Sequence, residues 1–191
     1  MYFSCCLILS GFIPTFVRDN KNYSPEYNTK VKNNMKIILL VVGKTNDEYI
    51  NKLIDNYIQR LKHYTDFEWQ TIAELKNTKN MPEGTQKEKE GEAILKATEN
   101  ADEIFLLDEH GDQPTSVEFS GLISKYMNKG TRKLVFVIGG PYGFSEAVYK
   151  KITKKISLSK MTFSHQMVRL IFVEQLYRAF TIIKGESYHH E

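Results

Sequence analysis

Two continuous apolar runs that end abruptly in glycine constrain the fold of this chain more than any other feature of its sequence. Residues 36–42 read KIILLVV before Gly43, and residues 133–138 read KLVFVI before Gly139 and Gly140. Runs of this length, rich in β-branched side chains, are typical of strands that are buried on both faces of a parallel sheet. They predict an α/β fold.

Segments with helical periodicity separate the predicted strands. Apolar side chains recur at a helical spacing from Tyr49 to Leu61, after a capping residue that is either Asn46 or Asp47. A capping-box pattern predicts that another helix begins at Thr115. The other predicted elements are strands over 67–75, 103–111 and 155–159, a largely solvated helix over 87–100, and a final helix over about 165–183. This alternation predicts a mostly parallel sheet of five to six strands with helices on both faces.

The N-terminal part of the chain differs in composition from the rest. An apolar run over 5–16 contains a glycine and a proline, lacks preceding basic residues, and is shorter than the roughly 20 residues that span a bilayer. We therefore interpret 1–34 as a disordered or non-native extension, and 35–191 as one domain. The only cysteines are Cys5 and Cys6, so that domain can hold neither a disulfide nor a thiolate metal site. This is typical of a protein in a reducing, cytoplasmic setting.

The charge of the chain limits how it could bind nucleic acid. The formal net charge is +3, and 1–34 holds four basic and two acidic residues, so 35–191 is nearly neutral. A domain with so little net charge cannot hold RNA by bulk electrostatic attraction and needs a local patch. One lysine-rich span could supply phosphate contacts, although such a span is more often a solvated face. Its members are Lys150, Lys151, Lys154, Lys155 and Lys160.

The stretch IGGPYGF, which begins at the end of the strand predicted over 133–138, is the first candidate for a ligand site. In an open α/β sheet, ligands bind at the carboxyl ends of strands, and glycines let a ligand approach bare backbone. The alternative is a tight strand-to-helix turn that binds nothing. The stretch has neither the G-x-G-x-x-G spacing of a dinucleotide site nor the G-K-S/T of a P-loop. On its own it leaves both interpretations open.

Three C-terminal motifs, IGGPYGF, SLSKMTFSHQMVRLIFVEQLYRAF and GESYHHE, together with the opening MKIILLVVGK, resemble the RlmH family. Members of that family are SPOUT-class methyltransferases that act on N3 of a pseudouridine in large-subunit ribosomal RNA. The resemblance spans 35–191. It implies S-adenosylmethionine as the cofactor, a cytoplasmic homodimer and a C-terminal trefoil knot, with neither a metal nor a membrane. One departure is Ser164, where the family usually has proline, but a serine there can cap the last helix.

The resemblance also implies which residues form the site. Its cofactor-binding positions correspond here to Leu107, Gly139, Gly140, Leu158, Ser159, Lys160, Met161, Thr162 and Phe163. It places Tyr188 and His190 in the RNA-side pocket of the dimer. We expect His190 or Glu191 to assist removal of the N3 proton. Arg169 or Arg178 would position the RNA backbone.

Other interpretations of these residues stay open. His189, His190 and Glu191 could hold a metal, although adjacent histidines at a chain end are more often a frayed tail. Glu174 and Arg178 are four residues apart on the last predicted helix and can form a salt bridge there. The whole domain could be a ribosome-associated binding module without activity, but such a module has no need of the IGGPYGF and LSKMTF motifs.

The final predicted helix is apolar around much of its circumference. One helix in a domain of this size cannot bury all of that surface against its own sheet, so we expect a twofold interface there. The apolar residues are Met167, Val168, Leu170, Ile171, Phe172, Val173, Leu176, Tyr177, Phe180 and Ile183.

Overall fold

The computed structural model of the chain describes residues 35–75 and 81–189. The extension predicted over 1–34 lies outside the described residues, as do His190 and Glu191. Within the described ranges, no helix is long and apolar enough to cross a membrane.

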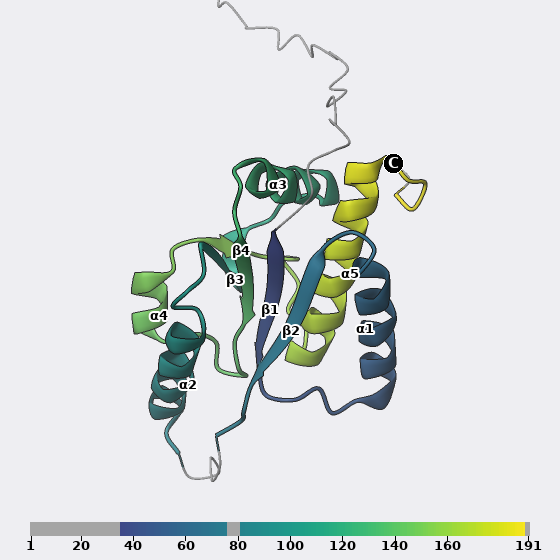
Figure 1. Ribbon diagram of the computed structural model, residues 1–191. Coiled ribbons are helices and arrows are strands. Elements are labelled where there is room, and N and C mark those ends of the chain that lie inside the picture. Colours follow the sequence, from purple (N-terminus) through teal and green to yellow (C-terminus); the bar gives the residue numbers. More distant parts are fainter. Residues whose placement is uncertain (1–34, 76–80, 190–191) are drawn as a thin grey trace, which may run out of the picture. The chain divides into compact units, whose positions relative to one another are not determined.

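Five strands form one parallel sheet in the order β2-β1-β4-β3-β5 (Figure 1). The strands are β1 (Lys36–Val42), β2 (Asp66–Ile72), β3 (Glu103–Asp112), β4 (Lys133–Ile138) and β5 (Lys155–Ile156). β1 lies between β2 and β4, with Leu39 opposite Trp69 on one side and Phe136 on the other. The predicted parallel α/β sheet is therefore confirmed, with five strands.

Helices cover both faces of this sheet (Figure 1). They are α1 (Glu48–Leu61), α2 (Glu83–Ala97), α3 (Ser116–Asn128), α4 (Glu146–Lys151) and α5 (His165–Lys184). Because side chains alternate along a strand, Leu39 of β1 packs into the core shared with α1, α3 and α5, and Leu40 packs into the core shared with α2 and α4. The sheet thus has an apolar core on each face, as the continuous apolar runs predict.

Side chains cap several helices where the sequence predicts it. Of the two candidates before α1, Asp47 is the cap, and its carboxylate accepts a hydrogen bond of 2.9 Å from the Ile50 N–H. Thr115 forms the predicted capping box with Glu118 at the start of α3. Ser164 accepts a hydrogen bond of 3.3 Å from the Met167 N–H, which confirms the prediction that this serine can cap α5.

Three predicted elements differ from the structure. The strand predicted over 67–75 spans Asp66–Ile72 and so ends three residues earlier. The helix predicted over 87–100 as largely solvated begins instead at Glu83, and it buries Gln86, Glu90, Gly91 and Ile94. Its charged sequence suggested exposure, but this face packs against α4 and the loop after β4. The strand predicted over 155–159 ends at Ile156; the Ser157 N–H still donates to the Asp112 carbonyl of β3, but the Ser157 hydroxyl then bonds to the Ser159 carbonyl, and the chain leaves the sheet. The trefoil knot stays a prediction.

Candidate functional site

A cavity of about 650 Å³ opens at the carboxyl edge of the sheet, where the second half of β3 meets the loops after β4 and β5. Its volume lies within the roughly 300–1,000 Å³ of small-ligand sites. The structure brings together there nearly all the residues that the sequence assigns to cofactor binding: Leu107, Gly139, Gly140, Leu158, Ser159, Met161, Thr162 and Phe163. Lys160, the remaining one, is exposed and does not line the cavity.

The packing around the loop after β4 gives a second reason, besides ligand access, for glycine at positions 139 and 140. Neither Gly139 nor Gly140 has a positive φ; in this loop only Gly143 does, at 78°. A β-carbon on Gly140 would collide with the buried carboxylate of Glu90, and one on Gly139 would lie 3.2 Å from the Phe144 ring. The packing of the chain itself therefore disfavours side chains at both positions, which the interpretation from sequence did not include.

Side-chain hydrogen bonds hold the segment that follows β5, in addition to the packing of Leu158 against the core. Ser157 Oγ donates to the Ser159 carbonyl at 2.9 Å, and Ser159 Oγ accepts from the Met161 N–H at 2.9 Å. Met161 itself is 74% exposed at the cavity. A large apolar side chain left open to solvent beside a cavity is available for contact with a ligand or a partner.

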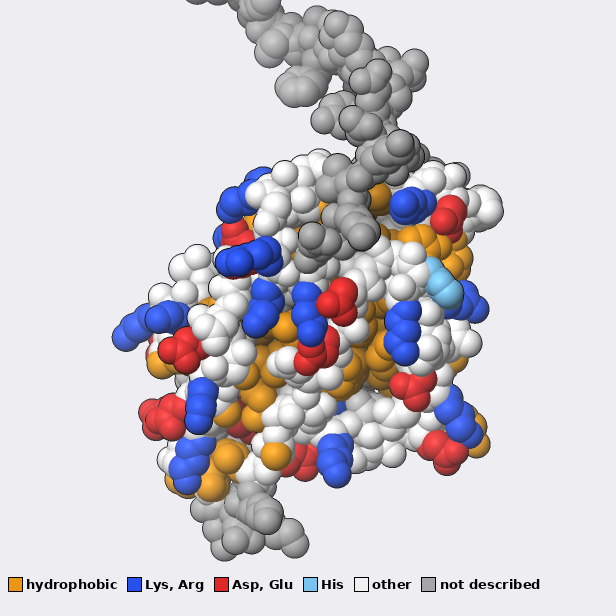
Figure 2. Space-filling model, viewed as in Figure 1, with side chains coloured by type: hydrophobic (Ala, Val, Ile, Leu, Met, Phe, Trp, Pro, Cys, Tyr) orange, Lys and Arg blue, Asp and Glu red, His pale blue; other side chains and the backbone are white. Residues whose placement is uncertain are grey.

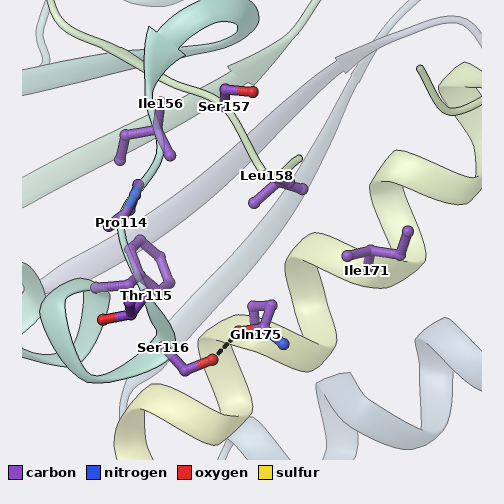
Figure 3. A pocket seen from close by; sticks show the side chains of 9 residues that line it. Pro114, Thr115, Ser116, Ile156, Ser157, Leu158, Ile171 and Gln175 are labelled. Atoms are coloured by element: carbon purple, nitrogen blue, oxygen red, sulfur yellow. Dashed lines mark hydrogen bonds between the residues drawn. The ribbon is translucent and has the colours of Figure 1, made fainter. Parts of the chain in front are cut away.

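A second, smaller cavity of about 270 Å³ lies on the other side of the same segment, between α3 and α5 (Figure 3). Ile156, Ser157 and Leu158 line both cavities. In the smaller one, Ser116 Oγ of α3 donates to Gln175 Oε1 of α5 at 2.7 Å. The segment predicted to bind the cofactor, which begins at Leu158, therefore starts between the two cavities.

Asp108, which the sequence analysis missed, lines the larger cavity directly after Leu107. Its side chain is only 6% exposed. Tyr149 donates its hydroxyl to Oδ2 at 2.5 Å, and the His110 N–H donates to Oδ1 at 2.9 Å. Burial would raise the pKa of Asp108, but these hydrogen bonds outweigh burial and lower it, so the group is an anion at neutral pH. One signal in the sequence could have identified Asp108: it is an acidic residue that directly follows the apolar run of β3, at the edge of the sheet where ligands bind.

Arg169 lies in the core, with no exposed surface. Its Nη1 donates to Thr45 Oγ1 at 2.8 Å and its Nη2 donates to the Val42 carbonyl at 2.6 Å. Burial lowers the pKa of this guanidinium, and the charge of Glu74 opposes that shift. The expected contact between Arg169 and RNA does not fit this placement. Its geometry instead ties the start of α5 to the end of β1, so it is a positioning residue.

The C-terminal residues pack beside α1 and the second half of α5. The Tyr188 hydroxyl donates to Glu174 Oε1 at 3.1 Å, and the Tyr188 and Tyr177 ring centres are 4.9 Å apart. Arg178 makes the predicted salt bridge to Glu174, at 2.6 Å, and lies over the Tyr188 ring. α5 has 20 residues, which corresponds to a length of about 30 Å. Tyr188 reaches back to Glu174 in the middle of α5, whereas the cavity is lined by His165 and Val168 at the start of that helix; neither Tyr188 nor His189 lines the cavity of its own chain.

Comparison with known proteins identifies the family. A family model described as "Predicted SPOUT methyltransferase" matches residues 35–189. The chain belongs to this family.

Two curated relatives are similar to this chain over nearly their whole length. The "Ribosomal RNA large subunit methyltransferase H" of Parabacteroides distasonis is 58% identical over 157 residues, which cover 82% of this chain and 100% of the relative. The protein of the same name from Christiangramia forsetii is 59% identical over 156 residues, which cover 82% of this chain and 99% of the relative. A solved structure, "a probable methylase family protein" from Haemophilus influenzae Rd KW20, covers 83% of this chain and 71% of its own, with a TM-score of 0.47 and 11% identity. That likeness is too weak to add to the assignment.

Charges on the surface of this SPOUT methyltransferase chain are mixed. Lysine and arginine side chains alternate with acidic ones on the face shown in Figure 2. Within the lysine-rich span, Lys154 pairs with Glu103, which also accepts from Lys129 at 2.7 Å. The span therefore has less free positive charge than its sequence suggests. Among residues 35–75 and 81–189, no group of three or more His, Cys, Asp or Glu side chains is placed to hold a metal.

Proposed function

We propose that this chain transfers a methyl group from S-adenosylmethionine to N3 of a pseudouridine in 23S ribosomal RNA, in the cytoplasm and on the assembled ribosome. The observation that carries the proposal is the cavity at the carboxyl edge, where β3 and the loops after β4 and β5, far apart in the sequence, bring the expected cofactor residues together. The names of the relatives, large-subunit ribosomal RNA methyltransferases at 58–59% identity, support the same substrate class.

The residues of the cavity fit the cofactor. Gly139 and Gly140 present backbone without side chains, and Leu107 and Leu158 supply apolar walls that suit an adenine ring. When bound, S-adenosylmethionine supplies the methyl group. The task of the protein is to hold the acceptor nitrogen in line with it, and positioning of this kind can lower a barrier by about 7–11 kcal/mol.

We propose a homodimer in which the tail of one protomer acts at the cavity of its partner. Neither Tyr188 nor His189 lines the cavity of its own chain, and this supports action of the tail in trans. Apolar surface is available for the interface: Met167 of α5 is 38% exposed, and Tyr49 and Leu53 of α1 are 78% and 50% exposed. An antiparallel pairing of two α5 helices would bring each tail towards the partner's cavity.

The chemical roles follow from this arrangement. His190 or Glu191 would take the N3 proton as a general base, a contribution of about 10²–10⁴-fold in rate. Arg178, whose side chain is 25% exposed, replaces Arg169 as the residue that contacts the RNA backbone. Lys160, exposed at the edge of the cavity segment, can reach a phosphate.

The mixed surface charge favours an assembled ribosomal surface over free RNA as the substrate. Without a large positive field, binding depends on shape, and a folded ribosome presents a defined shape. The test is transfer of a tritiated methyl group to free 23S RNA, to the large subunit and to the whole ribosome. We expect labelling of the assembled ribosome to exceed labelling of free RNA at least about tenfold; equal labelling of the three would contradict this part of the proposal.

The rival function is a ribosome-binding module without activity. Calorimetric titration separates the two, because a module has no reason to bind S-adenosylmethionine. Failure to bind at millimolar ligand would favour the module.

A further inference from the structure

The larger cavity contains an anionic group that the cofactor assignment does not use. Asp108 projects its carboxylate into the cavity wall, and both oxygens accept hydrogen bonds, one from the Tyr149 hydroxyl and one from the His110 N–H. With 6% of its side chain exposed, this carboxylate is held in one place by its neighbours. A buried, fixed carboxylate acts on a ligand charge more strongly than a solvated one, because less water screens it.

The charge of Asp108 is not neutralised by a lysine or an arginine. In the part of the chain that the structure describes, its only ion-pair contact is His110 Nδ1, at 3.2 Å. Lys87 lines the same cavity but forms no ion pair with it. Lys155 lies over the Tyr149 ring, 5.5 Å from its centre, and Glu109 adds a second acidic side chain to the lining. The cavity wall around Asp108 therefore favours a positively charged ligand.

We propose that Asp108 is a specificity-determining residue, whose carboxylate makes the cavity prefer the cationic methyl donor over the product that has lost its charge. This inference rests on the proposed function. S-adenosylmethionine and S-adenosylhomocysteine differ by one methyl group and by the positive charge on sulfur. Asp108 directly follows Leu107, an expected cofactor contact, and both line the cavity, so a sulfonium bound on that side of the cavity would lie near the carboxylate. Loss of that charge on transfer weakens the attraction and favours release of the product.

Tyr149 has a separate part in this arrangement. Its hydroxyl fixes the carboxylate and joins α4 to the end of β3, but it carries no charge of its own. Burial, with the hydrogen bond to Asp108, raises the pKa of Tyr149, so it stays protonated as the donor. Removal of this hydroxyl leaves the charge in the cavity and removes only a structural link, which makes Tyr149→Phe a matched control.

The test is calorimetric titration of the full-length parent, Asp108→Asn and Tyr149→Phe with both ligands at neutral pH. We expect the donor-to-product affinity ratio to fall about tenfold in Asp108→Asn, equivalent to 1.4 kcal/mol, and to change less than about twofold in Tyr149→Phe. Asp108→Glu, which keeps the charge, should keep the parental ratio. A ratio that is unchanged in Asp108→Asn, with both ligands weakened equally, overturns the inference and leaves the proposed function standing.

A second measurement does not depend on the folding of a variant. An analogue that carries an ammonium group in place of the sulfonium should bind the unaltered protein more tightly than S-adenosylhomocysteine. Equal or weaker binding of the analogue overturns the inference. A parent protein that binds none of the three ligands overturns the proposed function and this inference together.

Discussion

The buried carboxylate of Glu90 on α2 lies against the backbone of Gly140, in the space that a side chain on Gly140 would need. Gln86 donates to Glu90 Oε1 at 2.8 Å, whereas Oε2 has no hydrogen-bond partner among the described residues. This contact joins α2, whose charged sequence predicts exposure to solvent, to the loop after β4, which lines the cavity. Gly140 therefore has a reason in the packing of the chain itself, in addition to access for a ligand, and the sequence alone does not show it.

Gly140→Ala should lower the free energy of unfolding by about 1–3 kcal/mol, because the new methyl group overpacks against Glu90. The double variant Glu90→Ala, Gly140→Ala should recover part of that loss, since it removes the obstructing carboxylate. Urea unfolding of the parent, both single variants and the double variant measures the coupling. If the two single losses in free energy of unfolding simply add in the double variant, the Glu90 carboxylate is not what disfavours a side chain at position 140.

Gly139→Ala tests the ligand side of the same loop. The neighbour of its new methyl group is the Phe144 ring at 3.2 Å, which can shift, so the variant should stay folded. We expect its affinity for S-adenosylmethionine to fall at least about tenfold, or 1.4 kcal/mol, by calorimetry. Parental affinity would show that this glycine serves only the turn.

Arg169→Lys should destabilise the protein by about 2–4 kcal/mol, because a single ammonium cannot replace both guanidinium hydrogen bonds in the core. Arg178→Lys is the matched control on the same helix, at a partly exposed salt bridge, and should cost less than about 1 kcal/mol. Urea unfolding of the two variants gives the comparison. Equal losses would contradict the view that Arg169 fixes α5 in place.

Glu103 should make stability depend on acid pH. Hydrogen bonds from Lys129 and then Lys154 lower the pKa of Glu103 below its ordinary value of 4.5. A lowered native pKa means that the stabilisation is complete above the unfolded pKa and is lost as pH falls through the native one. Glu103→Gln should therefore cost about 1–2 kcal/mol at pH 7, with the difference from the parent shrinking below pH 4.5. Exposed Glu92→Gln is the control, and a pH-independent difference would contradict the account.

Action of the tail in trans predicts that two inactive variants can complement each other. A chain that ends after Ser187 should bind S-adenosylmethionine but not methylate, whereas Thr162→Trp should fill the cavity and fail to bind. Mixed and allowed to exchange protomers, the two should regain up to about a quarter of parental activity, since one in four random site combinations has both an open cavity and a partner tail. Full activity of the truncated chain alone would remove the tail from the mechanism.

Local patterns account for what the sequence predicts correctly. β1 and β4 are continuous apolar runs, and Thr115 with Glu118 is a local capping signal, so neither needs information about distant parts of the chain. The cofactor residues were predicted by resemblance rather than by pattern, because bare backbone has no signature in side-chain chemistry. Their convergence on one cavity depends on the sheet order, which brings the second half of β3 together with the loops after β4 and β5.

The residues that were misjudged all depend on tertiary contacts. Glu90 lies in the charged sequence KEKEGE, and nothing local indicates that one of its carboxylates packs against a loop about 50 residues further along the chain. Arg169 has the side chain of an RNA-binding residue, but the fold places it beside Thr45 and the Val42 carbonyl. Asp108 has a local signal in its place after an apolar run, but its burial and its hydrogen bond from Tyr149 of α4 depend on the fold.

The central claim is methyl transfer to N3 of a pseudouridine, and nucleoside mass spectrometry tests it most directly. Ribosomes that lack the modification would be incubated with the protein and S-adenosylmethionine, and their 23S RNA digested to nucleosides. The account predicts one N3-methylated pseudouridine per large subunit, formed by the parent and absent with the chain that ends after Ser187. A methyl group on any other nucleoside, or none at all from a protein that binds S-adenosylmethionine, would contradict it.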